Sequence, residues 1–399
     1  MSGTRLPDVK WRRERELVQL LDVLGAGDGE TRFVGGCVRD SLLRLPVNDV
    51  DLATRLRPEE VLERLKAARI KAVPTGIAHG TVTAVIAGKP VEVTTLRRDV
   101  STDGRRATIA YTDDWREDAS RRDFTINALS AEAGDGLVHD YFEGLADLGA
   151  RRVRFIGDPL TRIAEDHLRI LRFFRFHARF GRGAPDSAAL EACTARANDL
   201  MALSRERIAD ELLKLLALPE PVAAVRLMVE RAILRPFLPE ASNVDSLERL
   251  VDAERIAGVP PAPLRRLAAL LPPDPMLAAD VAARLRLSKK AAKRLALAAD
   301  RTVAAPQRLA FRIGTESAID RLLLAGETGG EVAALAAWQP PRLPISGGDL
   351  IAMGMIAGPL VARTLRDVEK EWEESGFPED REAVRAIARA AIDQALREK

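Results

Sequence analysis

The pattern of apolar and polar positions divides the chain into two parts. Residues 1–150 alternate between the periodicity of helices and the two-residue periodicity of strands, whereas residues 151–399 have helical periodicity almost throughout. We therefore expect an α+β part followed by an all-helical part. Pro and Gly clusters divide the second part into helical blocks, near residues 183–185, 219–221, 259–263, 272–275 and 339–344.

The first part has the pattern of a small sheet with flanking helices. In order along the chain, we expect helix 9–24, strand 31–34, helix 37–45, strand 48–54, helix 58–68, strands 81–86 and 90–96, and strand material at 124–131 and 136–139. This order predicts a mixed sheet with helices on one face. Residues 98–114 are polar and lack periodicity, which predicts a mobile loop.

Composition narrows the possible functions. The 61 basic and 59 acidic side chains give a net charge of +2, so any nucleic-acid contact has to come from local basic patches. Cys37 and Cys193 cannot build a disulfide framework, and no Cys or His cluster has the spacing of a zinc site. No apolar run approaches 18 residues, which predicts no membrane span and a cytoplasmic protein.

The strongest chemical signal lies at residues 33–52. Gly35 and Gly36 separate a predicted strand from a predicted helix, where the missing Cβ atoms let a phosphate group approach the backbone. Arg39 falls in the first turn of that helix, on the phosphate side. Asp49 and Asp51 alternate along the next predicted strand, so their carboxylates face the same way. Their mutual repulsion favours a bound cation, and hard oxygen ligands suit Mg²⁺.

In combination, these motifs resemble the polymerase β-type nucleotidyltransferase superfamily, and within it the class II tRNA nucleotidyltransferases and bacterial poly(A) polymerases. The further matching segments are residues 91–97, 121–129, 140–148 and 165–173. They are similar to the strand before the family's flexible loop, its second motif, its hinge and its nucleotide-selecting motif. One departure is Glu143-Gly144, where other members often carry Gly-Gly.

The resemblance implies a fold and a domain order. We expect a polymerase β-like nucleotidyltransferase head at 1–150, followed by an all-α neck at 151–215, body at 216–285 and tail at 286–399. A basic cluster at residues 284–301 is either a solvated helix face or a phosphate-binding patch. Its candidate RNA contacts are Lys289, Lys290, Lys293 and Arg294.

The nucleotide-selecting segment has a physical logic of its own. On one helix, a slanting polar stripe would contain Asp166, Arg169, Arg172 and Arg175. Asp166 and Arg169 would brace each other, one accepting from a base amino group and the other donating to a ring acceptor. Because cytosine and adenine both place an amino group beside an acceptor, a fixed pair would admit them and reject uracil and guanine. A salt-bridged surface helix is the alternative interpretation.

Two further residues are candidates through the resemblance. In the family, the arginine at the position of Arg122 contacts the nucleotide; here it could also pair with Asp123. Superfamily members often use a third carboxylate to help deprotonate the attacking hydroxyl, which Glu92 could supply. A structural pair of Glu92 with Arg97 or Arg98 is the alternative.

The resemblance implies that the 3′-hydroxyl of an RNA attacks the α-phosphate of CTP or ATP and that pyrophosphate leaves. Asp49 and Asp51 would hold two Mg²⁺ ions, one activating the hydroxyl and one steadying the leaving group. The plain form of residues 76–83 and the full-length loop, expected to help switch the pocket from C to A, favour complete CCA addition to tRNA. Addition of A alone, poly(A) synthesis and non-catalytic tRNA binding are the alternatives, and no protein partner is predicted.

Overall fold

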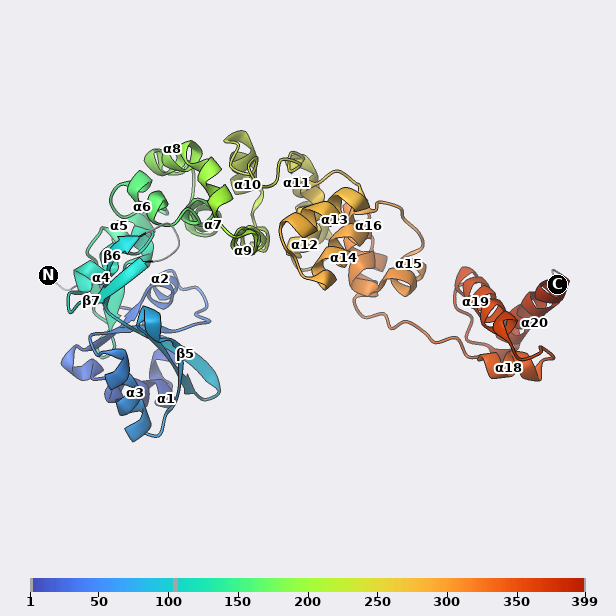
Figure 1. Cartoon of the computed structure of the whole chain (residues 1–399), viewed down its shortest axis with the longest axis horizontal. Coiled ribbons are helices and arrows are strands. Elements are labelled where there is room, and N and C mark those ends of the chain that lie inside the picture. Colours follow the sequence, from blue (N-terminus) through green and yellow to red (C-terminus); the bar gives the residue numbers. More distant parts are fainter. Residues whose placement is uncertain (1–2, 103–106, 398–399) are drawn as a thin grey trace. The chain divides into compact units, whose positions relative to one another are not determined.

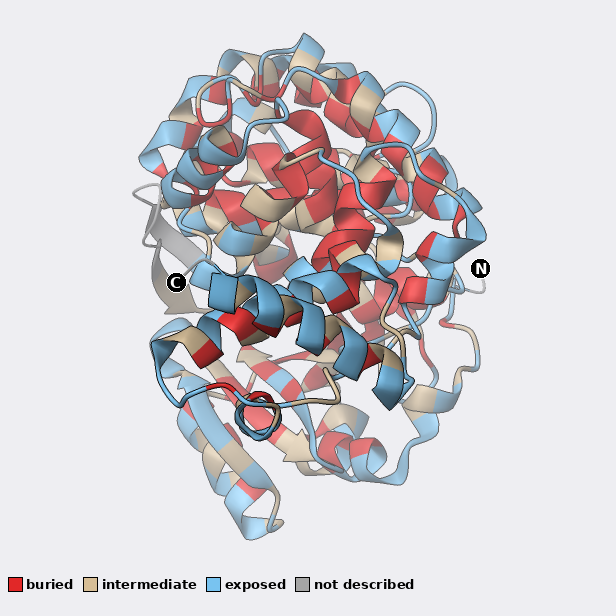
Figure 2. Cartoon of the chain, turned by 90° about the vertical axis from the view of Figure 1, so that its right-hand side faces the viewer, coloured by how far each residue is buried: buried red, intermediate tan, exposed pale blue. Residues whose placement is uncertain are grey.

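The computed structural model describes residues 3–102 and 107–397, with backbone only for the described residues between 99 and 108. The chain forms two compact units, residues 1–241 and 242–399. Helix α10 (Val222–Glu230) packs on α7 (Arg169–Phe180), which joins the segment after residue 215 to the first unit. The domain boundaries expected at residues 150, 215 and 285 stay predictions. In Figure 2, buried residues line the inner faces of the helices and exposed residues cover the outer ones.

A mixed sheet forms the base of the first unit. In the described part of the chain its seven strands follow the order β3-β4-β5-β2-β1-β8-β9. The strands are β1 (Thr31–Val34), β2 (Asp51–Thr54), β3 (Lys71–Gly76), β4 (Thr81–Ile86), β5 (Lys89–Thr95), β8 (Ser130–Glu132) and β9 (Val138–His139). Strands β2 and β5 run parallel, whereas β1–β2, β1–β8, β3–β4 and β4–β5 run antiparallel. The expected mixed sheet is confirmed.

Helices α1 and α3 cover one side of this sheet, side by side beside β5 in Figure 1. Leu17 and Leu20 of α1 and Val61 and Leu65 of α3 are buried there, as helical periodicity predicts. The helices of the first unit are α1 (Arg15–Val23), α2 (Gly36–Leu42), α3 (Pro58–Ala67), α4 (Trp115–Ser120), α5 (Gly144–Gly149), α6 (Pro159–Glu165), α7, α8 (Ser187–Ala195), α9 (Arg205–Leu216) and α10.

The mobile loop predicted at residues 98–114 was expected to lack strands, and in that respect the prediction was wrong. The segment forms an antiparallel pair of strands, β6 (Arg97–Thr102) and β7 (Ala107–Tyr111), apart from residues 103–106, which lie outside the described residues. The segment does contain residue types that favour strands, namely Thr, Ile and Tyr at positions 108, 109 and 111. The charged residues around them interrupted the alternation that would have predicted a strand.

Other local predictions also need correction. The strand material expected at 124–131 is strand only at its end, where β8 begins at Ser130. Thr125–Asn127 form a 3-10 helix instead, beside the Asp123 carboxylate, which accepts from the Phe124 amide and the Asn127 side chain. The expected first helix is divided into a 3-10 turn, Lys10–Arg13, and α1. Strand β3 was missed because it is an edge strand whose residues are mostly exposed, so no alternation marks it.

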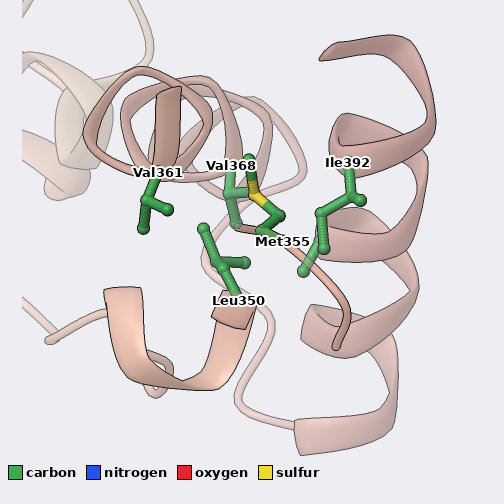
Figure 3. Close-up of a cluster of buried hydrophobic side chains, with 6 residues drawn as sticks. Leu350, Met355, Val361, Val368 and Ile392 are labelled. Carbon is green, nitrogen blue, oxygen red and sulfur yellow. The ribbon is translucent and has the colours of Figure 1, made fainter. Parts of the chain in front are cut away.

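The second unit consists of helices: α11 (Val244–Ile256), α12 (Pro263–Leu270), α13 (Pro275–Arg284), α14 (Lys289–Ala299), α15 (Pro306–Ile313), α16 (Thr315–Leu324), α17 (Gly330–Leu335), α18 (Gly347–Ala352), α19 (Pro359–Glu374) and α20 (Arg381–Arg397). Helices α13 and α14, which follow each other in the chain, pack against each other. Figure 3 shows Leu350, Met355, Val361, Val368 and Ile392 converging from α18, the turn after it, α19 and α20. Among the described residues, no helix is both long enough and apolar enough to cross a bilayer.

Candidate nucleotidyltransferase site

Three carboxylates gather at the start of β2. Asp51 is the first residue of that strand, and in the parallel register it pairs with Glu92 of β5. Asp49 precedes the strand and is exposed, so the expected alternation of the two aspartates along one strand was wrong in detail. Burial raises the pKa of Asp51, and so do the nearby charges of Glu92 and Asp49, although Arg122 opposes them. The site therefore concentrates negative charge that a cation would relieve.

This donor set fits a divalent metal. No three potential ligands among His, Cys, Asp and Glu lie close enough to form a protein-only metal site in the part of the chain that the structure describes. Mg²⁺ commonly takes one or two carboxylates together with substrate phosphates, so such a site is not required. Asp49 and Asp51 are the residues that would hold the ion, and the raised pKa of Asp51 is the observation that fits them to it.

The glycine turn lies beside Arg122. Gly35 follows β1 with a φ of 68°, a conformation that favours glycine, and α2 begins at Gly36. A Cβ atom on Gly35 would lie 3.0 Å from Nη1 of Arg122. The charge of Arg122 also works to lower the pKa of Asp51, so this arginine lies near both the glycine turn and the acidic residues.

Arg39 has an internal role that its sequence position did not reveal. Its guanidinium donates to the side chains of Asn127 and Asp40 and lies 4.1 Å from the ring centre of Phe180. The side chain is buried, and burial lowers the pKa of Arg39 although Asp40 opposes the shift. The structure thus explains Arg39 as a link between α2 and α7, and its contact with a triphosphate stays a prediction.

A polar network continues from Asn127 into the helices. Asn127 donates to Oδ1 of Asp123, and Arg172 donates to Oδ2 through Nε at 2.8 Å and Nη2 at 2.6 Å. Burial alone would raise the pKa of Asp123, but Arg172 and Asn127 outweigh it, and the pKa is lowered. Nη1 of Arg172 also lies 3.7 Å from buried Glu211 of α9, which accepts from Nε of Arg175 at 2.7 Å. The two arginines are therefore held by internal carboxylates.

The expected brace between Asp166 and Arg169 was wrong. Asp166 ends α6 with extended backbone angles, and α7 begins only at Arg169, so the two residues do not share one continuous helix. Oδ2 of Asp166 accepts from Arg207 at 2.8 Å. Arg169 instead pairs with Glu165, and its Nη2 donates to the carbonyl of Arg121 at 3.1 Å. Each residue is nevertheless held by partners of its own, and Arg169 reaches the backbone of Arg121 in the second motif.

Sequence reasoning missed four residues that organise this site: Asp118, Asn127, Arg207 and Glu211. Asn127 lies inside the segment 121–129 that resembles the second motif, but its amide is uncharged and did not mark it as a site residue. Arg207 and Glu211 are four residues apart on α9, so they lie on one helix face, and that spacing was a readable signal. Their partners on the selecting segment, in contrast, cannot be read from spacing.

The candidate RNA-binding residues on α14 differ in their surroundings. Lys289, Lys290 and Lys293 are exposed. Arg294 is bound to Asp320, with Nη2 2.9 Å from Oδ1, and also pairs with Glu316. The lysines are therefore better placed than Arg294 to meet an RNA phosphate.

The fold and the arrangement of these residues agree with the nucleotidyltransferase that the motifs predict. Residues 31–154 match the family described as "Poly A polymerase head domain", and residues 184–244 match "Probable RNA and SrmB- binding site of polymerase A". The chain is 34% identical over 382 residues to the mitochondrial CCA tRNA nucleotidyltransferase 1 of Mus musculus, covering 90% of this chain and 87% of that relative. It is 32% identical over 374 residues to the CCA-adding enzyme of Limosilactobacillus fermentum, covering 88% and 90%.

A solved structure has the same fold. The Bacillus stearothermophilus CCA-adding enzyme in complex with CTP matches with a TM-score of 0.73 at 24% identity, covering 96% of this chain and 99% of that one. The chain belongs to the class II CCA tRNA nucleotidyltransferase and poly(A) polymerase family. The resemblance inferred from the motifs is confirmed, and so is the α+β fold with a helical remainder. Membership of this family implies dependence on a divalent metal ion.

Proposed function

We propose that this protein adds CCA to the 3′ end of tRNA without a nucleic-acid template. It transfers CMP from CTP and then AMP from ATP, and pyrophosphate leaves at each step. The observation that carries the proposal is the convergence of Asp51, Arg122 and the Gly35 turn in a chain whose relatives are named as CCA-adding enzymes.

The acidic residues supply the centre of the reaction. Asp49 and Asp51 would hold Mg²⁺, which when bound would supply positive charge to the reacting hydroxyl and to the departing pyrophosphate. Glu92, in register with Asp51, is our candidate to accept the proton of the attacking 3′-hydroxyl. Its position beside Asp51 favours this role over a pair with Arg97 or Arg98.

The triphosphate and the base take different parts of the site. Gly35 and Gly36 let the triphosphate approach the backbone, with Arg122 beside them. Asp166 accepts from the amino group of cytosine or adenine, and Arg169 donates to the neighbouring ring acceptor. Arg207 orients the first of these side chains.

Arg172, Arg175 and Arg39 complete the proposed nucleotide-binding set. The carboxylates that bind them fix their positions, and in this proposal their remaining N–H groups donate to ribose or phosphate oxygens. Each guanidinium has five N–H donors, so internal pairing and ligand contact are compatible.

The remaining parts of the proposal concern the hairpin, the tail and the cellular location. The β6–β7 hairpin helps the pocket change from C to A. Lys289, Lys290 and Lys293 contact tRNA phosphates, with Arg294 in a lesser role because Asp320 holds it. We place the reaction in the cytoplasm, and cell fractionation tests that assignment, since some relatives are named as mitochondrial.

One incubation series tests the function. The protein and Mg²⁺ are offered tRNA ending before CCA, tRNA ending in CC, and an unrelated RNA, each with CTP, ATP or both. Products are resolved at single-nucleotide steps. We expect the first tRNA to gain three residues and stop, with the unrelated RNA unchanged.

The other outcomes identify the alternatives. Extension of the CC-ended tRNA alone, by one A, would make the protein an A-adding enzyme. Long A tails on unrelated RNA would make it a poly(A) polymerase. Folded protein that incorporates nothing would refute the catalytic assignment, and binding of tRNA would then be the function to test.

A further inference from the structure

A buried carboxylate on α4 connects two elements that the proposed reaction uses. Asp118 is 3% exposed and lies between the base of the β6–β7 hairpin and the second motif. Its Oδ1 accepts from the backbone amide of Arg97, the first residue of β6, at 3.2 Å and from Nε of Arg121 at 3.0 Å. Its Oδ2 lies 3.5 Å from Nη2 of Arg122.

Both arginines lead directly into the site. The charge of Arg122 works to lower the pKa of Asp51, and its Nη1 lies beside Gly35 of the glycine turn. The backbone carbonyl of Arg121 accepts from Nη2 of Arg169, one of the two proposed base-reading residues. One carboxylate therefore sets the positions of a phosphate-side arginine and of the backbone that supports a base-side arginine.

The charge balance shows that this carboxylate is held ionised. Burial alone would raise the pKa of Asp118, but Arg121 and Arg122 outweigh it, and the pKa is lowered. The side chain is too enclosed to meet a substrate of its own. An ionised carboxylate that contacts only protein groups, among them Arg121 and Arg122, is suited to hold those side chains in position.

We propose that Asp118 is a positioning residue for nucleotide binding, which holds Arg122 beside the acidic residues and Arg121 beneath Arg169. The proposal rests on the proposed function, because it takes Arg122 and Arg169 as nucleotide ligands. Loss of the Asp118 charge then frees the Arg122 side chain and weakens nucleotide binding, while Asp49 and Asp51 stay in place. The predicted kinetic signature is a rise in KM that exceeds the fall in kcat.

The test compares Asp118→Asn, Arg122→Ala and the double variant in the full-length protein. CTP affinity is measured by equilibrium binding with Mg²⁺, and KM and kcat by incorporation of CMP into tRNA that lacks CCA. We expect Asp118→Asn to weaken CTP binding and raise KM roughly tenfold, as removal of a supporting contact commonly does. The double variant should bind CTP clearly less than tenfold worse than Arg122→Ala alone, because the part of the effect that passes through Arg122 is then already lost and only the part through Arg121 and Arg169 remains.

Glu254→Gln is the matched control. Glu254 is likewise a buried carboxylate, bound to Nε of Arg266 at 2.8 Å, but it belongs to the second unit. Its neutralisation should lower the melting temperature and leave CTP affinity unchanged. Asp118→Glu, which retains the charge, should recover part of the affinity and replaces Asp118→Asn in the comparison if the latter does not fold.

The outcomes separate this inference from the proposed function. Wild-type affinity in folded Asp118→Asn, or full additivity with Arg122→Ala, overturns the positioning role. Wild-type protein that binds CTP but extends no tRNA refutes the proposed function, and the binding measurement still decides the role of Asp118. Wild-type protein that binds no CTP overturns both.

Discussion

The first residue of α5, which follows Glu143, offers a sharp test of how tightly this helix packs against the second motif. Gly144 is the first residue of α5, and a Cβ atom there would approach the carbonyl oxygen of Thr125 to less than 3.0 Å and Cδ2 of Leu129 to 3.0 Å. The obstacle is backbone, and it is fixed: the amide of Thr125 donates to the carbonyl of Arg154 at 3.0 Å, and its hydroxyl donates to buried Asp147 at 2.6 Å. The chain cannot yield without disturbing the second motif.

Gly144→Ala should therefore destabilise the protein by about 1–3 kcal/mol, the usual cost of forcing an extra methyl group into a packed position. For a unit of this size that corresponds to a fall in melting temperature of roughly 2–12 °C. Gly149→Ala is the matched control, because it lies at the other end of α5 and its Cβ would meet nothing within 4 Å. Alanine there should gain about 0.5–1 kcal/mol, since glycine is the weaker helix former.

Thermal and urea unfolding, followed by circular dichroism, measure both variants against the wild type. The reasoning is refuted if Gly144→Ala is as stable as Gly149→Ala. A shared loss in both variants would indicate instead that α5 needs glycine for backbone freedom at both ends.

Three further predictions concern the charged groups. Asp51→Asn should abolish incorporation yet raise the melting temperature of the metal-free protein. The reason is that burial, Glu92 and Asp49 raise the pKa of Asp51 and make its charge unfavourable near neutral pH. Mg²⁺ should raise the melting temperature of the wild type more than that of the variant, and an equal rise would contradict the assignment of Asp51 as a metal ligand. Glu211→Ala leaves Arg172 and Arg175 without their shared carboxylate and should cost about 3–5 kcal/mol in urea unfolding, whereas a loss below 1 kcal/mol would show that the pair is dispensable. The pKa of Asp123 is lowered on folding, so its contribution is fully present above an unfolded pKa of about 3.9 and is lost as pH falls through the folded value; Asp123→Asn should flatten the acid limb of stability against pH, and an unchanged limb would argue against it.

The sequence predicted those features that depend on residues close to one another in the chain. Strand Thr31–Val34 and the glycine turn after it follow from residues within one short segment, and the strand predicted at 48–54 is present, although it begins only at Asp51. The polar stripe expected along the nucleotide-selecting segment leaves Ile170 and Phe173 of α7 on the opposite side, and both are fully enclosed. These features depend on neighbours in sequence, so a pattern is enough to predict them.

The rest depends on partners that are far apart in sequence. Asp166 meets Arg207, 41 positions away, and Arg172 meets Asp123, 49 positions away. Helical spacing placed Asp166 beside Arg169, but the backbone leaves the helix at Asp166, whose carboxylate accepts from the amide of Leu168. A local turn between α6 and α7 therefore interrupts the periodicity, and no count of residues per turn could show it.

The internal pairing of the arginines bears on how a protein can replace a template strand. A flexible guanidinium would adapt to several bases, so selection by hydrogen-bond pattern needs donors whose positions are fixed before the nucleotide arrives. Glu165 fixes Arg169 and Asp123 fixes Arg172, so the side chains lose their freedom on folding and not on binding. If Arg169 reads the base as proposed, a wrong base would have to break the existing ion pair of Arg169 with Glu165 to find a partner. Under that proposal Glu165 would contribute to selectivity without touching the base, and an arginine that met only solvent would discriminate less.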